Sequence, residues 1–147
     1  MSFTTEPKQE MHVIGISCRT SNASNRASVD IPKLWMRFYG ENISALIPNK
    51  ASDHTVAVYC DYESDFTGEY TLILGCPVTS LDTIPDGFVA KTIPSGTYAK
   101  FICAGKLPES VFTTWQTIWQ EKNLNRSYIA DYELYTSPGD ASVFVGI

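Results

Sequence analysis

The residues best suited to chemistry stand close together near the end of the chain, in the run 130–135, Ala-Asp-Tyr-Glu-Leu-Tyr. Side chains alternate between the two faces of a strand, so Asp131, Glu133 and Tyr135 should share one face. If this face meets solvent, Glu133 is an ordinary surface glutamate. If it forms the floor of an aromatic pocket, Glu133 is a carboxylate that can receive a cation.

Aromatic residues recur along the chain at positions that could surround this carboxylate. Ring faces attract a cation and a nearby acid supplies the counter-charge, so an aromatic cage with a carboxylate suits a cationic or planar ligand. The alternative is that these rings form an ordinary core, as helix-spaced aromatic residues usually do. The candidate ligand-binding residues are Glu133, Trp35, Phe38, Tyr62, Tyr98, Trp115, Trp119 and Tyr135.

Two amphipathic helices are predicted to carry the tryptophans toward a sheet. The first is expected to have Asp30 as its N-cap and Pro32 in its first turn, and to end near Gly40. The second is expected to begin at Pro108 and to end near residues 122–123. Strands are predicted at 11–18, 55–62, 70–78, 88–93, 97–104, 131–135 and 141–147, and loops at 1–10 and 43–54.

The two halves of the chain agree in the order of their elements. The tripeptide Asp-Tyr-Glu at 61–63 recurs at 131–133, which makes Glu63 the expected counterpart of Glu133. Each half also places a strand and a Trp-bearing helix before this tripeptide. Such agreement is typical of an internal repeat.

We therefore predict an α+β fold made of two tandem strand-helix-strand-strand repeats. Each repeat leaves one sheet face to be covered by one helix, so the two should join into one antiparallel sheet with two helices and a central groove. The chain is short enough to form a single domain, 1–147, with repeats at about 10–80 and 88–147.

The composition argues against two classes of partner. Nucleic-acid binding draws its affinity from clustered Lys and Arg, whereas this chain has a formal net charge of −5, a pI near 4.9 and no basic run. The longest apolar run, 70–78, is too short to span a membrane. The first ten residues are polar and carry both signs of charge, so we expect no targeting peptide and a cytoplasmic protein.

Metal and cofactor sites are not predicted. The four cysteines lie inside strand-like runs, and no two of them form a CxxC pair. In a reducing compartment they are expected to be small buried hydrophobic residues. His12 and His54 lie far from each other and from any cysteine, so we expect neither a zinc site nor an organic cofactor.

Four ordered runs carry a resemblance to a known family. They are 31–38 (IPKLWMRF), 61–71 (DYESDFTGEYT), 94–101 (PSGTYAKF) and 131–135 (DYELY). Together they resemble the gyrase-inhibitor-like, AraC-type effector-binding domain family, and especially its stand-alone members carried on integron gene cassettes. The likeness covers nearly the whole chain from Glu10 onward.

The resemblance implies a duplicated module with a central ligand groove. In this family a glutamate on the late strand, which is Glu133 here, receives cationic and often polyaromatic compounds. In many relatives the domain follows a helix-turn-helix DNA reader, but only ten polar residues precede the first predicted strand here. We therefore expect a small-molecule sensor or sequestering protein that is not an enzyme and acts, if it regulates at all, in trans through a separate regulator.

Two alternative functions stay open. Some proteins similar to this family hydrolyse cyclopropane-bearing DNA-alkylating compounds, and Glu133 with Tyr98 could activate water for that reaction. A protein-interaction module is the other alternative. The acids Glu63, Asp65 and Glu69 could mimic DNA toward a basic partner such as gyrase, although a solvated hairpin tip would have the same sequence.

Overall fold

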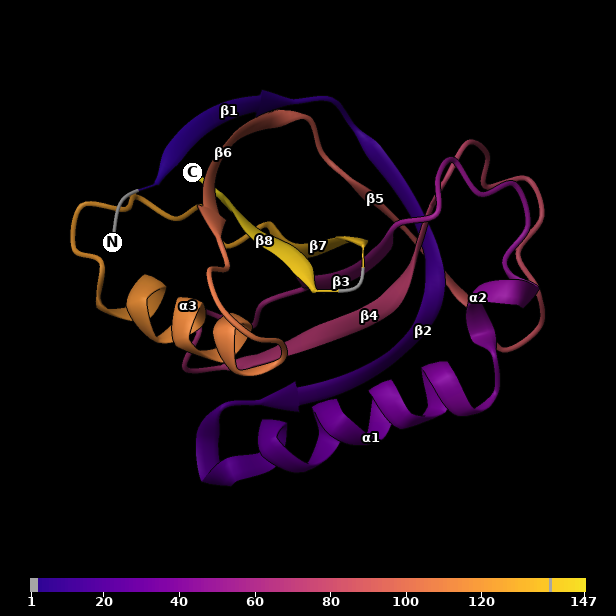
Figure 1. Cartoon of the computed structure of the whole chain (residues 1–147), viewed down its shortest axis with the longest axis horizontal. Coiled ribbons are helices and arrows are strands. Elements are labelled where there is room, and N and C mark those ends of the chain that lie inside the picture. The colour runs from indigo at the N-terminus through magenta and orange to yellow at the C-terminus, as the bar shows by residue number, and fades with distance from the viewer. Residues whose placement is uncertain (1–2, 138) are drawn as a thin grey trace.

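The computed structural model describes residues 3–137 and 139–147, which form one eight-stranded antiparallel sheet with α-helices packed against it (Figure 1). The strands are β1 (Thr4–Lys8), β2 (Met11–Ser21), β3 (Thr55–Cys60), β4 (Glu69–Val78), β5 (Val89–Ile93), β6 (Gly96–Ile102), β7 (Ala130–Ser137) and β8 (Asp140–Gly146). The helices are α1 (Arg26–Gly40), α2 (Ile43–Leu46) and α3 (Glu109–Gln120), and α1 follows the 3-10 turn η1 (Ala23–Asn25). The predicted α+β fold with a single antiparallel sheet is confirmed.

The strand order, β1-β6-β8-β7-β3-β4-β2-β5, reads as two matching halves that meet at β3 and β7. Each half contributes a hairpin, β3 with β4 and β7 with β8, as the sequence predicted. The strand that begins each half of the sequence lies beside strands of the other half. β1 pairs with β6, and β5 pairs with β2.

The pairing corrects one detail of the predicted repeat. The hairpins pair Tyr59 with Leu72 and Glu133 with Val143. Because Leu72 and Val143 occupy matching places in the last strands of the two halves, the counterpart of Glu133 is Tyr59. Glu63 lies beyond the end of β3, in the exposed loop that leads to β4. The alignment of the two halves on the repeated tripeptide was therefore wrong.

The helices cover one face of the sheet. Figure 1 shows α1 running alongside β2 and β4, where Leu34 and Phe38 pack on Ile14 and Leu74. α3 packs on β6 and β8 through a second cluster, and a third cluster without helix residues fills the opposite face. The largest members of this third cluster are Tyr98, Tyr132 and Phe144. Both faces of the central strands are thus buried, which explains their continuous apolar runs.

The N-terminal segment contains a strand that the sequence analysis treated as a loop. β1 lies at the edge of the sheet, where it pairs with β6. It carries Glu6 and Lys8, which form an ion pair at 3.3 Å. Charged residues are common on edge strands because they discourage pairing with other chains. The polar composition that hid this strand is therefore explained by its place at the edge.

Helix α1 begins five residues before the predicted start. Its N-cap is Asn25, and Asp30 and Pro32 both lie inside the helix. The early start is stabilised by Arg26, whose Nη1 lies 2.8 Å from Oε2 of Glu69 on β4. α3 begins after Pro108, as predicted, and ends two residues early at Gln120. In the described part of the chain, none of the helices has the length and apolar character needed to cross a membrane.

Candidate ligand-binding cavity

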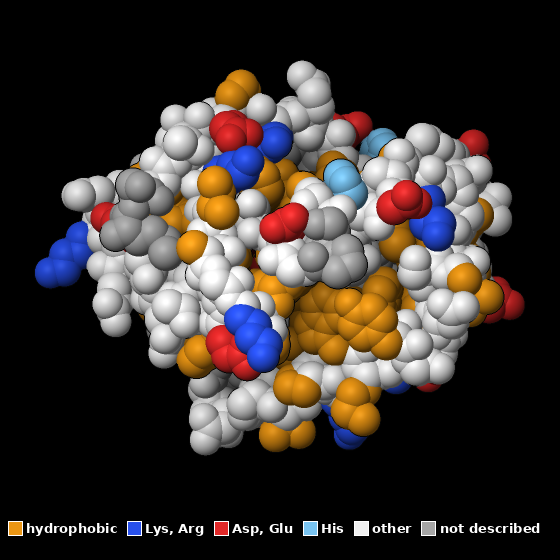
Figure 2. All heavy atoms as spheres, viewed as in Figure 1, with side chains coloured by type: hydrophobic (Ala, Val, Ile, Leu, Met, Phe, Trp, Pro, Cys, Tyr) orange, Lys and Arg blue, Asp and Glu red, His pale blue; other side chains and the backbone are white. Residues whose placement is uncertain are grey.

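A cavity of about 1260 Å³ opens between α1 and α3, on the face of the sheet that carries the helices. Figure 2 shows hydrophobic side chains gathered in a hollow on this side of the molecule. Ten aromatic side chains and Glu133 line the cavity, and they come from α1, α3, the β3–β4 loop and the central strands. These residues are Trp35, Tyr39, Tyr59, Tyr62, Phe66, Tyr70, Phe112, Trp115, Trp119, Glu133 and Tyr135.

Glu133 lies at the floor of this cavity and is only 2% exposed. Its Oε2 accepts hydrogen bonds from the hydroxyl of Tyr59 at 2.6 Å and from Nε1 of Trp115 at 2.7 Å. Its Oε1 accepts a hydrogen bond from the hydroxyl of Tyr135 at 2.5 Å. These three donors are neutral, so they orient the carboxylate without supplying a positive charge.

Burial and hydrogen bonding act in opposite directions on the pKa of Glu133. Burial raises this pKa above its ordinary value, and the bonds from Tyr135, Tyr59 and Trp115 partly offset the increase. Burial and the nearby Glu133 charge also raise the pKa values of Tyr59 and Tyr135. Both phenols therefore stay protonated and remain donors to the carboxylate.

The walls of the cavity are rings that hold one another in place. On the α1 side, the ring centre of Trp35 lies 5.6 Å from that of Tyr39 and 5.4 Å from that of Tyr135. On the α3 side, the ring centre of Trp115 lies 5.2 Å from that of Tyr59. Contacts of this kind restrict the rings, which favours a preformed aromatic site for planar or cationic groups.

Six of the eight candidate residues line the cavity. The six are Trp35, Tyr62, Trp115, Trp119, Glu133 and Tyr135. The helical spacing places Trp35 on the cavity side of α1 together with Ile31 and Tyr39. The strand alternation likewise places Tyr135 beside Glu133.

The other two candidate residues lie elsewhere. Phe38 is 2% exposed and packs with Leu34 between α1 and the sheet, because it lies on the adjacent stripe of the helix. Tyr98 lies on the opposite face of the sheet, where its hydroxyl donates to the Pro94 carbonyl at 2.7 Å. The structure therefore does not bring Glu133 and Tyr98 together as the hydrolase alternative required.

Tyr59 and Arg126 are the important residues that the sequence analysis missed. Tyr59 reaches Glu133 because β3 pairs with β7, a contact between residues 74 apart in the sequence. Strand alternation was the available signal for Tyr59, but it does not reveal which strands are neighbours. Arg126 lies between α3 and β7, in a segment without helix or strand periodicity, and also contributes to the cavity lining.

Asp131 is fully buried two residues before Glu133 and has a different set of partners. It accepts hydrogen bonds from the Tyr62 hydroxyl, from Nη2 of Arg126 at 2.7 Å and from the Gly146 backbone N–H at 2.9 Å. Its charge is thus balanced by an arginine. Among residues 3–137 and 139–147, no group of three or more His, Cys, Asp or Glu is placed to hold a metal ion.

The acids on the first hairpin do not form a uniform negative surface. Glu69 lies 2.8 Å from Arg26 and 3.6 Å from Arg19, so its charge is largely balanced. Asp65 accepts hydrogen bonds from the backbone and hydroxyl of Thr67 within the loop. The exposed Glu63 remains as a solvated acid at the tip. This arrangement gives little support to mimicry of DNA.

Comparison with known proteins agrees with the fold. Residues 5–144 match the family described as integron-associated effector binding protein. The Bacillus subtilis (strain 168) protein YobU, named as a transcriptional regulator, is 33% identical over 125 residues, which cover 82% of this chain and 78% of YobU.

Two solved structures are similar over almost the whole chain. An integron cassette protein of Vibrio cholerae has a TM-score of 0.80 and 27% identity, covering 99% of this chain and 95% of its own. The structure of SAV2435 bound to tetraphenylphosphonium has a TM-score of 0.77 and 17% identity, covering 99% and 93%. The resemblance carried by the four sequence runs is confirmed, and this chain belongs to the family of integron-associated effector-binding proteins.

Proposed function

We propose that this protein binds cationic aromatic small molecules in the cavity between α1 and α3, as a sensor or sequestering domain. Membership of an effector-binding family supports a role in small-molecule binding. A protein of the same fold is bound to tetraphenylphosphonium, which is a bulky aromatic cation. The finer assignment to cations rests on the chemistry of the cavity floor.

The environment of Glu133 is the observation that carries the proposal. A buried carboxylate is costly unless its charge is compensated, and the bonds from Tyr59, Trp115 and Tyr135 compensate it only with neutral donors. Among the described residues, no Lys, Arg or His forms an ion pair with Glu133. A cation that enters the cavity would supply the missing counter-charge, while the surrounding rings present their faces to it.

The size of the cavity matches this class of ligand. Typical small-molecule sites have volumes of about 300–1,000 Å³. The cavity here is larger, at about 1260 Å³, and ten of its 26 lining residues are aromatic. It can therefore accept a ligand with several rings. In the proposed function, the charge of a ligand matters more for its selection than a close fit to one molecular shape.

The proposal is tested by calorimetric titration with tetraphenylphosphonium and with triphenylphosphine oxide as a neutral aromatic control. We expect one cation to bind per chain and the neutral compound to bind at least tenfold more weakly. Equal affinities for the two compounds would refute the cationic assignment.

Recovery of the bound compound separates binding from catalysis. After incubation, mass spectrometry should return the ligand unchanged and in amounts equal to the protein. Chemically altered compound in excess of the protein would show turnover. The protein would then be a hydrolase, and the binding function would be wrong. A candidate panel for this measurement should include strained, cyclopropane-bearing compounds, because these test the alternative most directly.

A further inference from the structure

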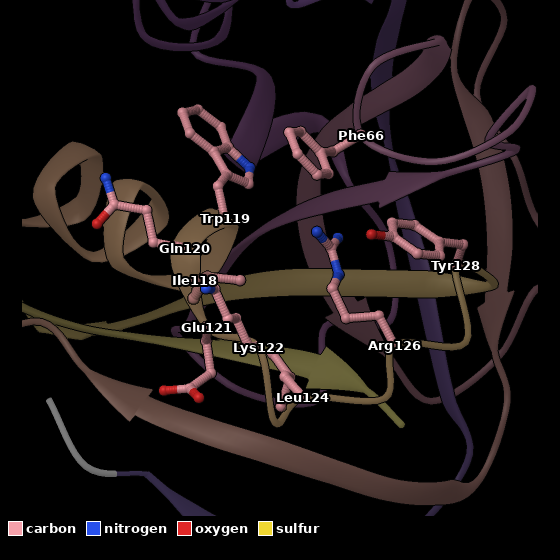
Figure 3. A pocket seen from close by; sticks show the side chains of 9 residues that line it. All are labelled: Phe66, Ile118, Trp119, Gln120, Glu121, Lys122, Leu124, Arg126 and Tyr128. Atoms are coloured by element: carbon pink, nitrogen blue, oxygen red, sulfur yellow. The ribbon is translucent and has the colours of Figure 1, made fainter.

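A smaller cavity, of about 450 Å³, adjoins the main cavity at the end of α3. The two cavities share the side chains of Phe66, Trp119 and Arg126, so a ligand in one can extend into the other. Figure 3 shows the Arg126 guanidinium pointing toward the space beneath Trp119 and Phe66, with Tyr128 beside it. Arg126 is therefore the polar group that a ligand would meet at this junction.

The guanidinium of Arg126 is held between two rings. Its central carbon lies 4.3 Å from the ring centre of Tyr128 and 5.8 Å from that of Trp115. The side chain is 5% exposed, and its Nη2 donates to Asp131 at 2.7 Å. The ring contacts leave the N–H groups along the edges of the guanidinium to make further hydrogen bonds.

Those edges carry unused donors. Nε and Nη1 of Arg126 are buried and have no hydrogen-bond partner among the described residues. Buried donors without an acceptor are rare, and an acceptor that reaches a charged donor is bound more strongly than one that reaches a neutral donor. Since both groups are covered, an acceptor reaches them only when part of the cavity lining moves, and this lining includes Phe66, which lies on the β3–β4 loop and stacks on Trp119 with ring centres 5.9 Å apart.

We propose that this smaller cavity is a subsite for an uncharged acceptor oxygen of the ligand, such as an ester or amide carbonyl. The charge of Arg126 is already balanced by Asp131, and the cavity lining also contains one further residue of each charge, Lys122 and Glu121. A carboxylate on the ligand would add a negative charge near Asp131 to a site where the charges of Arg126, Lys122, Asp131 and Glu121 already sum to zero. A carbonyl oxygen accepts the hydrogen bonds without this repulsion.

Trp115 relates this subsite to the proposed cation site, and the inference rests on that proposed function. Its Nε1 donates to Glu133 at 2.7 Å, while its ring faces the guanidinium of Arg126. The cation site and the acceptor site therefore lie on either side of one indole. The ligand class that fits both is an aromatic cation that carries a carbonyl oxygen about one indole width from its charge.

Three dyes that differ in one substituent test the inference. Tetraethylrosamine, rhodamine B ethyl ester and rhodamine B share a xanthene cation and a phenyl ring, and carry respectively hydrogen, an ester and a carboxylate on that ring. In fluorescence anisotropy titrations we expect the ester to bind about tenfold more tightly than the rosamine, the scale of one hydrogen bond to a charged group. The carboxylate should bind more weakly than the ester.

Variants of Arg126 show whether the preference arises at this site. Arg126→Met should bring the ester and the rosamine to equal affinity. If that variant does not fold, Arg126→Lys keeps a positive charge beside Asp131 but loses the planar donor edge, and it should remove most of the preference. Arg37→Met is the matched control, because Arg37 is an exposed arginine on α1 that lines neither cavity, and it should leave the preference unchanged.

The outcomes separate this inference from the proposed function. Equal binding of the rosamine and the ester, which are both monocations, to the wild-type protein would overturn the inference and leave the cation site intact. A preference for the ester that survives in Arg126→Met and in Arg126→Lys, or a carboxylate that binds as tightly as the ester, would also overturn it. If none of the dyes binds, the inference and the proposed function fail together.

Discussion

Two acids on β7, Asp131 and Glu133, lie two residues apart on the same face of the sheet and have opposite surroundings. Asp131 is fully buried and forms an ion pair with Arg126. Glu133 is almost equally buried, yet its donors are two phenols and one indole. Burial is therefore the same for both residues, and the difference lies in whether a positive charge is present.

This difference separates a structural acid from a binding acid. An acid that is already paired with an arginine gains little from a second cation, and removal of its charge leaves the arginine unpaired. An acid that is held only by neutral donors keeps its capacity to attract a cation. We expect substitutions of Asp131 to act mainly on stability and substitutions of Glu133 to act mainly on ligand affinity.

The largest effect is expected for Asp131→Asn. This change leaves the buried guanidinium of Arg126 without its counter-charge, so the free energy of unfolding should fall by about 3–5 kcal/mol. Urea unfolding of the empty protein measures this free energy. Glu133→Gln is the control, because it also replaces a buried carboxylate by an amide of the same size. A loss of less than 1 kcal/mol, or an equal loss in the control, would contradict the distinction between the two acids.

The second effect is expected for Glu133→Gln, which keeps the size of the side chain and removes its charge. Affinity for tetraphenylphosphonium should fall by about 1–3 kcal/mol, the scale of losing one partner of a charged contact. Stability should be unchanged or slightly higher, because a buried charge is relieved. The same titration on Glu63→Gln, an exposed acid in the β3–β4 loop, should show wild-type affinity. Equal affinity of all three proteins would show that Glu133 does not organise the site.

The third prediction concerns pH. Burial raises the pKa of Glu133 in the folded empty protein above its value in the unfolded chain. At a pH between these two pKa values, the folded protein keeps a proton on Glu133 that the unfolded chain has released. As the pH rises through this interval, the stability of the wild type should fall relative to that of Glu133→Gln. Affinity for a permanent cation should rise over the same interval, since the carboxylate becomes charged. Calorimetry and thermal unfolding of both proteins from pH 4 to pH 8 measure these trends, and parallel curves would refute the linkage.

The smallest effect is expected for Tyr135→Phe, which removes one donor from the carboxylate. The hydrogen bond from Tyr135 lowers the pKa of Glu133, so its loss should raise that pKa further. The pH at which cation affinity reaches half its maximum should move upward, while affinity at high pH changes little. Tyr98→Phe is the matched control on the other face of the sheet and should leave the midpoint unchanged. A downward shift in Tyr135→Phe would mean that the phenol destabilises the charged carboxylate.

Local periodicity was sufficient to predict much of the cavity. Alternation along β7 placed Glu133 and Tyr135 on one face, and helical spacing placed Trp35, Trp115 and Trp119 toward the sheet. These relations depend on residues that are close in sequence. The α+β fold followed from the order of the same elements, with the helices covering one face of the sheet.

The errors arose where long-range geometry decides. Periodicity divides a strand into two faces but does not say which face the helices cover, so Tyr98 was assigned to the wrong side. Tyr59 was missed because the pairing of β3 with β7 cannot be read from either strand alone. Arg126 lies in an irregular segment, where no period relates it to Asp131. The arginine that distinguishes the two acids was thus the least predictable part of the site.

The exchange of first strands between the two halves has a consequence for how the protein unfolds. β1 joins β6 through pairs such as Thr4 with Lys100, and β5 joins β2 through pairs such as Met11 with Ile93. Neither half can keep its sheet intact when the other unfolds. We therefore expect a single cooperative transition, and not the separate transitions of two independent domains. Since the ligand cavity spans both halves, a compound bound there should raise the melting temperature of the entire chain.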